Sequence, residues 1–191
     1  SQYSENQVFV TSDSDWQKVL VSLPITNWRE NGSLEENPVL IYSKEDGGTD
    51  VDSTTRFIQN YDPEKVKILG DSSEDFKDLL VASPDFGAGV SPSDIDEIDS
   101  DNLNSKFWDN VSEAVYTPGD YQKAMKAAVY ASESNLPLII EGYNERQHSD
   151  QDLNLTCVGV ESDKCNSSIT PDEALEKYND GSNNVKTVYT N

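Results

Sequence analysis

Histidine and long apolar runs are scarce in this chain of 191 residues. The single histidine, His148, excludes a metal site built from several imidazoles, and a Ser-His-Asp triad would have to use it. No apolar run approaches the roughly 18 residues of a membrane-spanning helix, so we expect no membrane insertion in this segment. The chain has no initiator methionine and no signal-like start, and we therefore expect a processed protein or a fragment.

Sequence signatures of catalysis are also missing. There is no Gly-x-Ser-x-Gly elbow and no phosphate loop, and Gly87-Ala88-Gly89 lacks the third glycine of a dinucleotide fingerprint. The polar stretch around His148 predicts a surface position for it. Asp120 and Glu141 are carboxylates of the kind that glycosidases use in pairs, but nothing in their spacing demands that chemistry. We expect no catalytic residues, no enzyme activity and no organic cofactor.

Basic residues are few, with 14 lysines and arginines against 36 aspartates and glutamates, for a formal net charge of −22. Nucleic-acid binding depends on basic side chains that displace counterions from the phosphates, so we expect no nucleic-acid partner. An anionic membrane face is repelled in the same way. A surface this acidic suits cations, cationic surfaces or a salty medium.

A repeated pattern organises what the chain does contain. An apolar strand ending in threonine leads into an acidic turn and a helix, which begins Asp15-Trp16-Gln17-Lys18 in the first copy and Asp120-Tyr121-Gln122-Lys123 in the second. An apolar run introduced by proline follows each helix, at residues 38–42 and 137–141. Strands that alternate with helices of this length predict parallel pairing through right-handed crossovers.

The repeat predicts an α/β fold of two units in tandem. We expect the first unit over residues 1–81 and the second over 107–191, with 82–106 as an acidic connector rich in glycine, proline and serine. The sequence of the first strand of the repeat begins again at Val188-Tyr189-Thr190, so the start of a third unit is expected there. Trp16 and Tyr121 match between the two helices, which favours core positions for both.

These residues resemble the type 2 cell-wall-binding repeat of bacterial S-layer and cell-wall proteins and of many archaeal surface proteins. The shared features are the strand ending in threonine, the acidic turn before the Asp-aromatic-Gln-Lys helix, the proline-led strands, and a strand that ends in glycine at Lys67-Ile68-Leu69-Gly70. The resemblance covers residues 7–71 and 114–191. It implies two Rossmann-like three-layer units with mostly parallel sheets, which bind or build the cell envelope without catalysis.

Two cysteines and four glycosylation acceptors bear on the location of the protein. Cys157 and Cys165 lie eight residues apart, and they are either a disulfide that closes a small loop or two buried thiols. The Asn-x-Ser/Thr acceptors are Asn31, Asn110, Asn154 and Asn166. Together, the cysteine pair and these acceptors favour a disulfide-bonded glycoprotein in an oxidising, extracellular setting.

Two groups of acidic residues are candidate cation sites. An acidic stretch before residue 102 supplies the carboxylates of Asp94, Asp96, Asp99 and Asp101. Oxygen-rich clusters suit Ca²⁺, although this spacing is not that of an EF-hand, and the alternative is a solvated acidic loop. The turns between strand and helix supply Asp13, Asp15 and Asp120. These turns lie at the edge where open α/β sheets bind ligands, and the alternative role for their carboxylates is helix capping.

We therefore expect a non-catalytic, extracellular structural domain of a surface-layer or surface-filament protein. Its partners would be like subunits or other cell-surface proteins. Subunits this acidic repel one another, and salt does not cancel that repulsion at contact, so we expect cations such as Ca²⁺ to assist assembly. The alternative is a module that binds a cell-wall polysaccharide or another sugar, but a charge of −22 is poorly suited to the anionic wall polymers on which bacterial relatives of the repeat dock.

Overall fold

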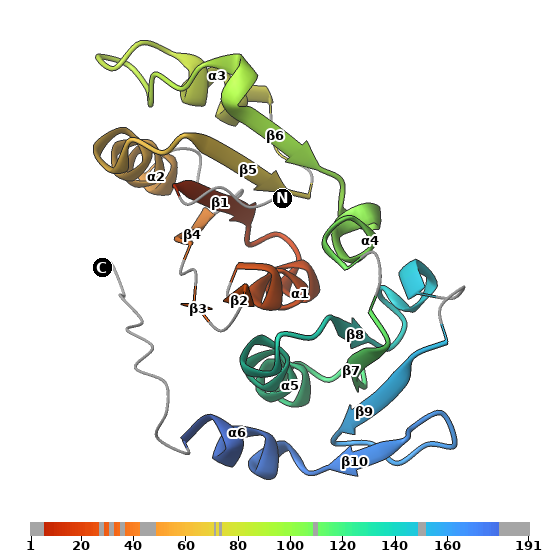
Figure 1. Ribbon diagram of the computed structural model, residues 1–191. Coiled ribbons are helices and arrows are strands. Elements are labelled where there is room, and N and C mark those ends of the chain that lie inside the picture. Colours follow the sequence, from red (N-terminus) through yellow and green to blue (C-terminus); the bar gives the residue numbers. More distant parts are fainter. Residues whose placement is uncertain are drawn as a thin grey trace.

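Two four-stranded parallel sheets flanked by helices make up the fold (Figure 1). The computed structural model describes residues 6–26, 29–30, 33–34, 37–42, 49–70, 72, 74–108, 111–148 and 152–179. The predicted α/β fold, with two Rossmann-like units, is confirmed. The expected third copy of the strand, at Val188-Tyr189-Thr190, lies outside the described residues.

The first sheet has the strand order β4-β1-β5-β6, and all its pairings are parallel. Its strands are β1 (Gln7–Ser12), β4 (Val39–Tyr42), β5 (Lys65–Leu69) and β6 (Ile95–Ile98). Its helices are α1 (Trp16–Thr26), α2 (Thr49–Tyr61), α3 (Glu74–Val81) and α4 (Leu103–Phe107), with short 3-10 turns η1 (Pro92–Asp94) and η2 (Ser100–Asn102). A small antiparallel pair, β2 (Arg29–Glu30) and β3 (Ser33–Leu34), follows α1.

The second sheet repeats this topology with the order β8-β7-β9-β10, again with parallel pairing throughout. Its strands are β7 (Glu113–Thr117), β8 (Leu138–Ile140), β9 (Asn154–Val158) and β10 (Ser167–Ile169). Its helices are α5 (Tyr121–Ser134) and α6 (Pro171–Asn179), with the 3-10 turn η3 (Glu145–His148). In both sheets the first strand lies between the second and the third, and the fourth forms an edge.

The segment expected to be a connector, residues 82–106, contributes to the first sheet instead. It contains β6, which pairs in parallel with β5 from Val66 opposite Ile95 to Leu69 opposite Ile98. Ile98 is buried, and together with Leu103 of α4 it packs beside Phe9. Strand β6 is hard to predict from the sequence, because it has only four residues, with an apolar residue at each end and acidic residues between them.

Alternation along β1 distributes its side chains between two apolar layers. Val8 and Val10 pack with Ile58 of α2 and Phe76 of α3 on one face of the first sheet. Phe9 points to the opposite face, where α1 and α4 lie. In the second sheet, Val115 packs against the alanine-rich face of α5 in the same way.

The second unit departs from the first on its outer face. In the first unit, α3 connects the third strand to the fourth and buries Phe76 and Leu80. In the second unit, the described residues between β9 and β10 form no helix, and the Cys157–Cys165 disulfide closes this loop. Val160 and Cys165 of the loop pack on a small cluster that includes Tyr116 and Ile139. In the second unit, the cystine loop and η3 therefore take the place of the helical layer that was expected on this face of the sheet.

Helices α1 and α5 lie between the two sheets and pack against each other (Figure 1). Leu20 and Val21 of α1 share one buried cluster with Ala124, Ala127 and other alanines of α5. Asn104 of α4 also joins the units, because its Nδ2 donates to the carbonyl oxygen of Leu138 at 3.0 Å. The contact between the repeats is thus a helix pair with a buried amide beside it.

Trp16 and Tyr121 are the first residues of α1 and α5, and they contact each other edge to face with ring centroids 5.3 Å apart. The expectation that the two aromatics occupy equivalent places is confirmed. The expectation that both are core residues is wrong, because 52% of Tyr121 is exposed. The aromatic position of the repeat marks the boundary between the units. None of the helices in the described residues is long and apolar enough to span a membrane.

Candidate functional site

The carboxyl ends of the strands are the first place to look for a site, because α/β sheets bind ligands where the strand order reverses. Here that point lies between β1 and β5 in the first unit and between β7 and β9 in the second. Threonines fix both pairs of strands at this end. Thr11 Oγ1 donates to the carbonyl of Leu69 at 3.1 Å, and Thr117 Oγ1 donates to that of Val158 at 3.2 Å.

Lys18 occupies this point in the first unit. It comes from the first turn of α1, only 4% of it is exposed, and its Nζ donates to Ser12 Oγ at 2.8 Å. Gly70 follows β5 with a φ of +79°, and a Cβ at this position would overlap the Lys18 stem. The glycine thus serves two needs, a left-handed backbone and room for a lysine to cross it.

Lys123 has the same arrangement in the second unit. Its Nζ donates to the carbonyl of Gly159 at 3.0 Å, and a Cβ on Gly159 would lie 3.0 Å from Lys123 Cδ. Gly159 has a φ of +72° and donates its N–H to Ile169, as Gly70 does to Ile98. We call these two arrangements the lysine–glycine clasps. The sequence alone does not reveal these clasps, although the lysine recurs in the repeat and Gly70 ends a predicted strand.

Two of the three carboxylates predicted at the strand–helix turns, those of Asp15 and Asp120, act as helix caps. Asp15 Oδ1 accepts the N–H of Gln17 at 2.9 Å, and Asp120 Oδ1 accepts the N–H of Lys123 at 3.0 Å. Asp13 is exposed, and its N–H donates to the carbonyl of Tyr42. Over the described part of the chain, no three Asp, Glu, His or Cys side chains come together in a group able to hold a metal ion.

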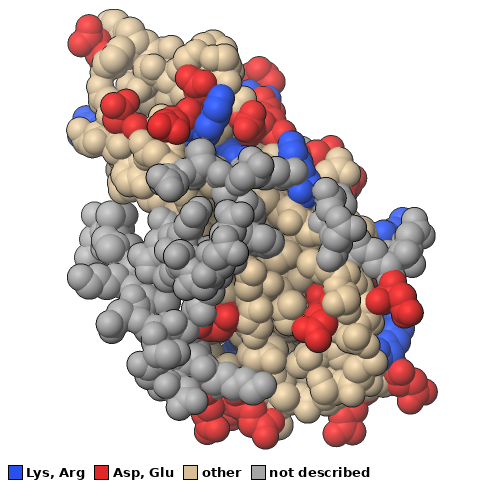
Figure 2. All heavy atoms as spheres, in the orientation of Figure 1, with Lys and Arg blue, Asp and Glu red and all other residues tan. Residues whose placement is uncertain are grey.

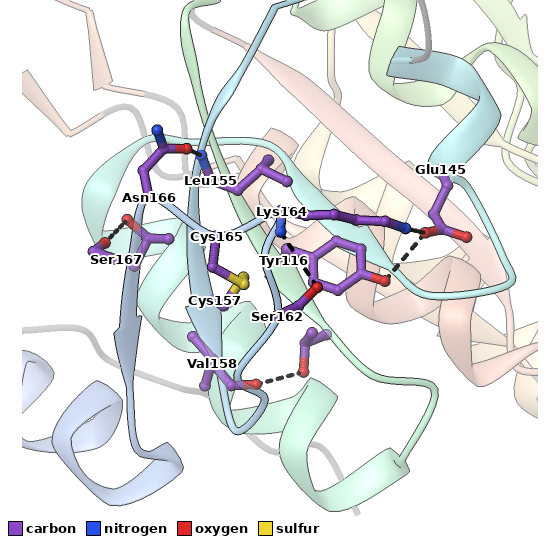
Figure 3. Close-up of a disulfide and its surroundings, with 12 residues drawn as sticks. Tyr116, Glu145, Leu155, Cys157, Val158, Ser162, Lys164, Cys165, Asn166 and Ser167 are labelled. Atoms are coloured by element: carbon purple, nitrogen blue, oxygen red, sulfur yellow. Dashed lines mark hydrogen bonds and ion pairs between the residues drawn. A yellow bond between two sulfur atoms is a disulfide. The ribbon is translucent and has the colours of Figure 1, made fainter.

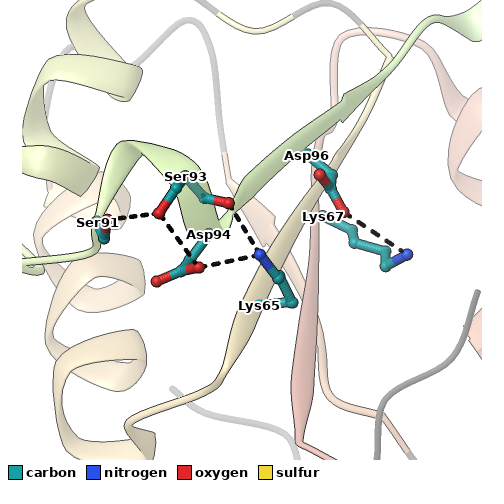
Figure 4. A network of polar contacts seen from close by, with 6 residues as sticks. All are labelled: Lys65, Lys67, Ser91, Ser93, Asp94 and Asp96. Carbon is teal, nitrogen blue, oxygen red and sulfur yellow. Dashed lines mark hydrogen bonds and ion pairs between the residues drawn. The ribbon is translucent and has the colours of Figure 1, made fainter.

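The acidic stretch is dispersed by its strand geometry. Asp94 pairs with Lys65 at 2.9 Å, and Asp96 lies 3.9 Å from Lys67, so neighbouring lysines of β5 take separate carboxylates (Figure 4). Asp99 Oδ1 accepts the N–H of Asp101 at 3.1 Å and so caps η2. The structure does not bring the four predicted ligands together.

Lysines also fix the outer side of β6. Glu97 pairs with Lys77 of α3 at 2.7 Å, and hydrogen bonds to Glu97 and Glu74 raise the pKa of Lys77. Burial lowers the pKa of Lys67, while Asp96 opposes that change. The ammonium group of Lys67 also lies 5.9 Å from the ring centre of Phe107. The result is an edge strand whose two middle side chains are charged and paired with lysines, and charged residues on an edge strand are a common means of preventing unwanted strand pairing.

A polar network holds the cystine loop on the second sheet (Figure 3). Tyr116 donates its hydroxyl to Glu145 Oε1 at 3.1 Å, and Lys164 Nζ lies 3.5 Å from the same oxygen. The Gly142 N–H, then Tyr116 and Lys164, hold the pKa of Glu145 below its usual value, against the effect of burial. Burial, with Glu145 next, raises the pKa of Tyr116. The disulfide predicted as one of two alternatives is present between Cys157 and Cys165.

Two of the four predicted glycosylation acceptors lie next to this disulfide. Asn154 begins β9 and Asn166 precedes β10, and both are exposed. Thr156 and Ser167, from the two acceptor motifs, face each other with their hydroxyl oxygens 3.1 Å apart. Asn31 and Asn110 lie outside the described residues.

His148 is not the surface residue that the polar stretch predicted. It ends η3 and is only 4% exposed. Gln147 beside it accepts the N–H of Asn104 and donates to the carbonyl of Ser100, which fixes η3 against the end of the first unit. Contacts between elements distant in sequence therefore bury the histidine, and its polar neighbours gave no indication of this.

Acidic side chains are spread over the visible face of the molecule, with fewer basic side chains among them (Figure 2).

Comparisons with protein-family models, curated proteins and solved structures find no match for this chain.

Proposed function

We propose that this chain is a non-catalytic structural module of an extracellular surface layer or filament, which assembles through contacts with like subunits. The lysine–glycine clasps carry the proposal. At the point where α/β sheets usually hold a ligand, lysine side chains of this protein lie against the glycines and tie helix to strand. The repeated motif thereby stabilises each unit at the place where a ligand would otherwise bind.

The disulfide supports an extracellular location. Disulfides persist in oxidising compartments and are rare in the cytosol, where thiols are kept reduced. Cys157 and Cys165 are bonded across the loop in which the described residues form no counterpart of α3, and two exposed glycosylation acceptors, Asn154 and Asn166, lie near them in the sequence. A cell-surface protein would keep this bond throughout its life.

The net charge of −22 supports assembly that depends on cations. Several lysines are already engaged within the chain, as in the pairs of Lys65 with Asp94 and of Lys77 with Glu97. The 36 acidic residues far outnumber the 14 basic ones, so bound cations such as Ca²⁺ would help to neutralise neighbouring subunits.

Assembly of the purified protein tests the proposal. Sedimentation velocity and negative-stain microscopy would be performed over a range of protein concentrations, with and without millimolar calcium. We expect regular multimers that grow with concentration and with calcium. A protein that stays monomeric under all these conditions, or that turns over a substrate, would contradict a structural role.

Binding of a sugar or wall polysaccharide is a second candidate, favoured by the aromatic pair between the units. Trp16 and Tyr121 stand at the starts of α1 and α5, and Tyr121 and Met125 are exposed beside each other on one turn of helix. An exposed ring of this kind offers an apolar face to a sugar. Saturable quenching of tryptophan fluorescence by wall polysaccharide, lost in Tyr121→Ala and kept in Tyr61→Ala, would favour this role.

A further inference from the structure

We propose that Asn166 is a glycan acceptor on the open edge of the second sheet. The inference depends on the proposed function in one respect, because the protein must reach an extracellular compartment where glycans are attached. The acceptor motif is Asn166-Ser167-Ser168, and all three residues are exposed. An exposed motif of this type is the usual place for an N-linked glycan in a secreted protein.

The backbone holds the Asn166 side chain in one orientation. Its Oδ1 accepts the N–H of Leu155 at 2.8 Å, and its own N–H donates to the Leu155 carbonyl at 2.9 Å. The two bonds continue the pairing of β10 with β9 by one residue, with a side chain in place of a backbone carbonyl. Because the oxygen is fixed toward β9, the nitrogen Nδ2 points away from the strands (Figure 3).

The nitrogen is therefore the free end of this amide. Within the described part of the chain, Nδ2 of Asn166 has no hydrogen-bond partner. Attachment of a sugar to Nδ2 keeps the Oδ1 acceptor and so keeps the bond from Leu155. Modification would thus leave the local fold unchanged.

The surroundings have room for a glycan. Strand β10 is one edge of its sheet. It pairs with β9, and no second described strand pairs with it. The other edge of this sheet, β8, is closed, because the Leu138 carbonyl accepts from Asn104 and Asn144 and the Ile140 N–H donates to Asn144. A bulky glycan therefore has space at β10 that it would not have at β8.

The reaction is a glycosyl transfer from a sugar donor activated as a phosphate ester. A bond forms between Nδ2 and the anomeric carbon of the sugar, and the bond from that carbon to the phosphate oxygen breaks. The phosphate ester leaves with the electron pair, and the proton lost by the amide nitrogen passes to solvent. No oxidant or reductant is required.

Peptide mass spectrometry tests the proposal on the protein isolated from its own cells. After reduction and alkylation, trypsin separates the two neighbouring acceptors, because residues 147–164 contain Asn154 and residues 165–177 contain Asn166. We expect the 165–177 peptide to carry a sugar mass, assigned to Asn166 by fragmentation that leaves glycans attached. An unmodified 165–177 peptide would overturn the proposal.

Two serine variants, expressed in the same cells, provide matched controls. Ser168→Ala destroys the motif but keeps the Asn166 amide and its bonds to Leu155, and we expect complete loss of the glycan. Ser167→Ala removes a neighbouring hydroxyl but keeps the motif, and we expect the glycan to remain. A sugar mass that persists in Ser168→Ala would overturn the assignment. An unmodified Asn166 in a protein that still forms its disulfide and its multimers would leave the proposed function intact.

Discussion

Gly70 and Gly142 both adopt a positive φ, at +79° and +75°, but they differ in what surrounds them. A Cβ at Gly70 would overlap the stem of Lys18, whereas no described residue, the chain neighbours apart, has an atom within 4 Å of one at Gly142. A comparison of the two positions therefore separates the cost of backbone strain from the cost of disturbing a clasp.

We predict that Gly142→Ala lowers the free energy of unfolding by about 1 kcal/mol, the typical penalty for a left-handed backbone with a side chain. Gly70→Ala should lower it by about 2–4 kcal/mol, because overpacking adds to the same penalty. Urea denaturation of both variants measures the difference. Equal losses would mean that Lys18 moves aside freely and that the clasp contributes nothing.

Glu145 should make the protein lose stability in acid. Its pKa is held down in the folded state by the Gly142 N–H, Tyr116 and Lys164, so its contribution is present above the unfolded value of about 4.3. That contribution is lost as the pH falls from there through the lower folded pKa. We predict that Glu145→Gln shows a smaller loss of stability between pH 7 and pH 3 than the parent protein. Glu161→Gln, in the nearby loop, is the control and should behave like the parent.

At the scale of elements, a cystine loop stands where a helix would be expected. Helix α3 covers the first sheet with Phe76 and Leu80, whereas the second sheet relies on the loop between β9 and β10. That loop brings only Val160 and Cys165 to the small cluster around Tyr116. Few apolar contacts would remain to hold it once the covalent bond was broken.

Reduction should therefore loosen the second unit selectively. For a loop of this length, a disulfide contributes about 2–3 kcal/mol by restricting the unfolded chain. We predict that the double variant Cys157→Ser, Cys165→Ser loses hydrogen-exchange protection in β9 and β10, while β1 and β5 keep theirs. A uniform loss across both sheets would show that the two units unfold together and that the loop has no local role.

The acidic edge strand β6 shows a different solution to an exposed edge. Charged side chains occupy its two middle positions, Asp96 and Glu97, and each has a lysine from a different element beside it. Single exposed ion pairs contribute little to stability, so their principal effect is to deny the edge to other strands. The acidic composition of this stretch is therefore compatible with a role inside one subunit.

At the scale of the whole molecule, two like units face each other through α1 and α5 and carry a large negative charge. Further copies would approach against that charge. At physiological ionic strength, salt screens the repulsion beyond about 8 Å but does not cancel it at contact. Cations would then bind between subunits, where assembly brings the acidic surfaces of two copies together.

We predict that excess EGTA, added to assembled material at constant ionic strength, loosens the assembly and lowers its thermal stability. Addition of calcium, but not of an equal ionic strength of sodium, should restore both. Light scattering and a thermal melt provide the measurements. An assembly indifferent to EGTA would remove calcium from the proposal and leave contacts between subunits in place.

Local patterns in the sequence determined much of this protein. The doubled Asp-aromatic-Gln-Lys motif predicted two like units, because helix caps and apolar periodicity act over a few residues. The short separation of Cys157 and Cys165 allowed a disulfide, because residues close in sequence can meet through a local loop.

Tertiary structure decided what those patterns mean. Lys18 meets Gly70 only because β1 and β5 are neighbours, and Asp94 and Asp96 meet separate lysines only because β6 and the turn before it lie beside β5. Such contacts depend on strand order, which joins residues far apart in the chain.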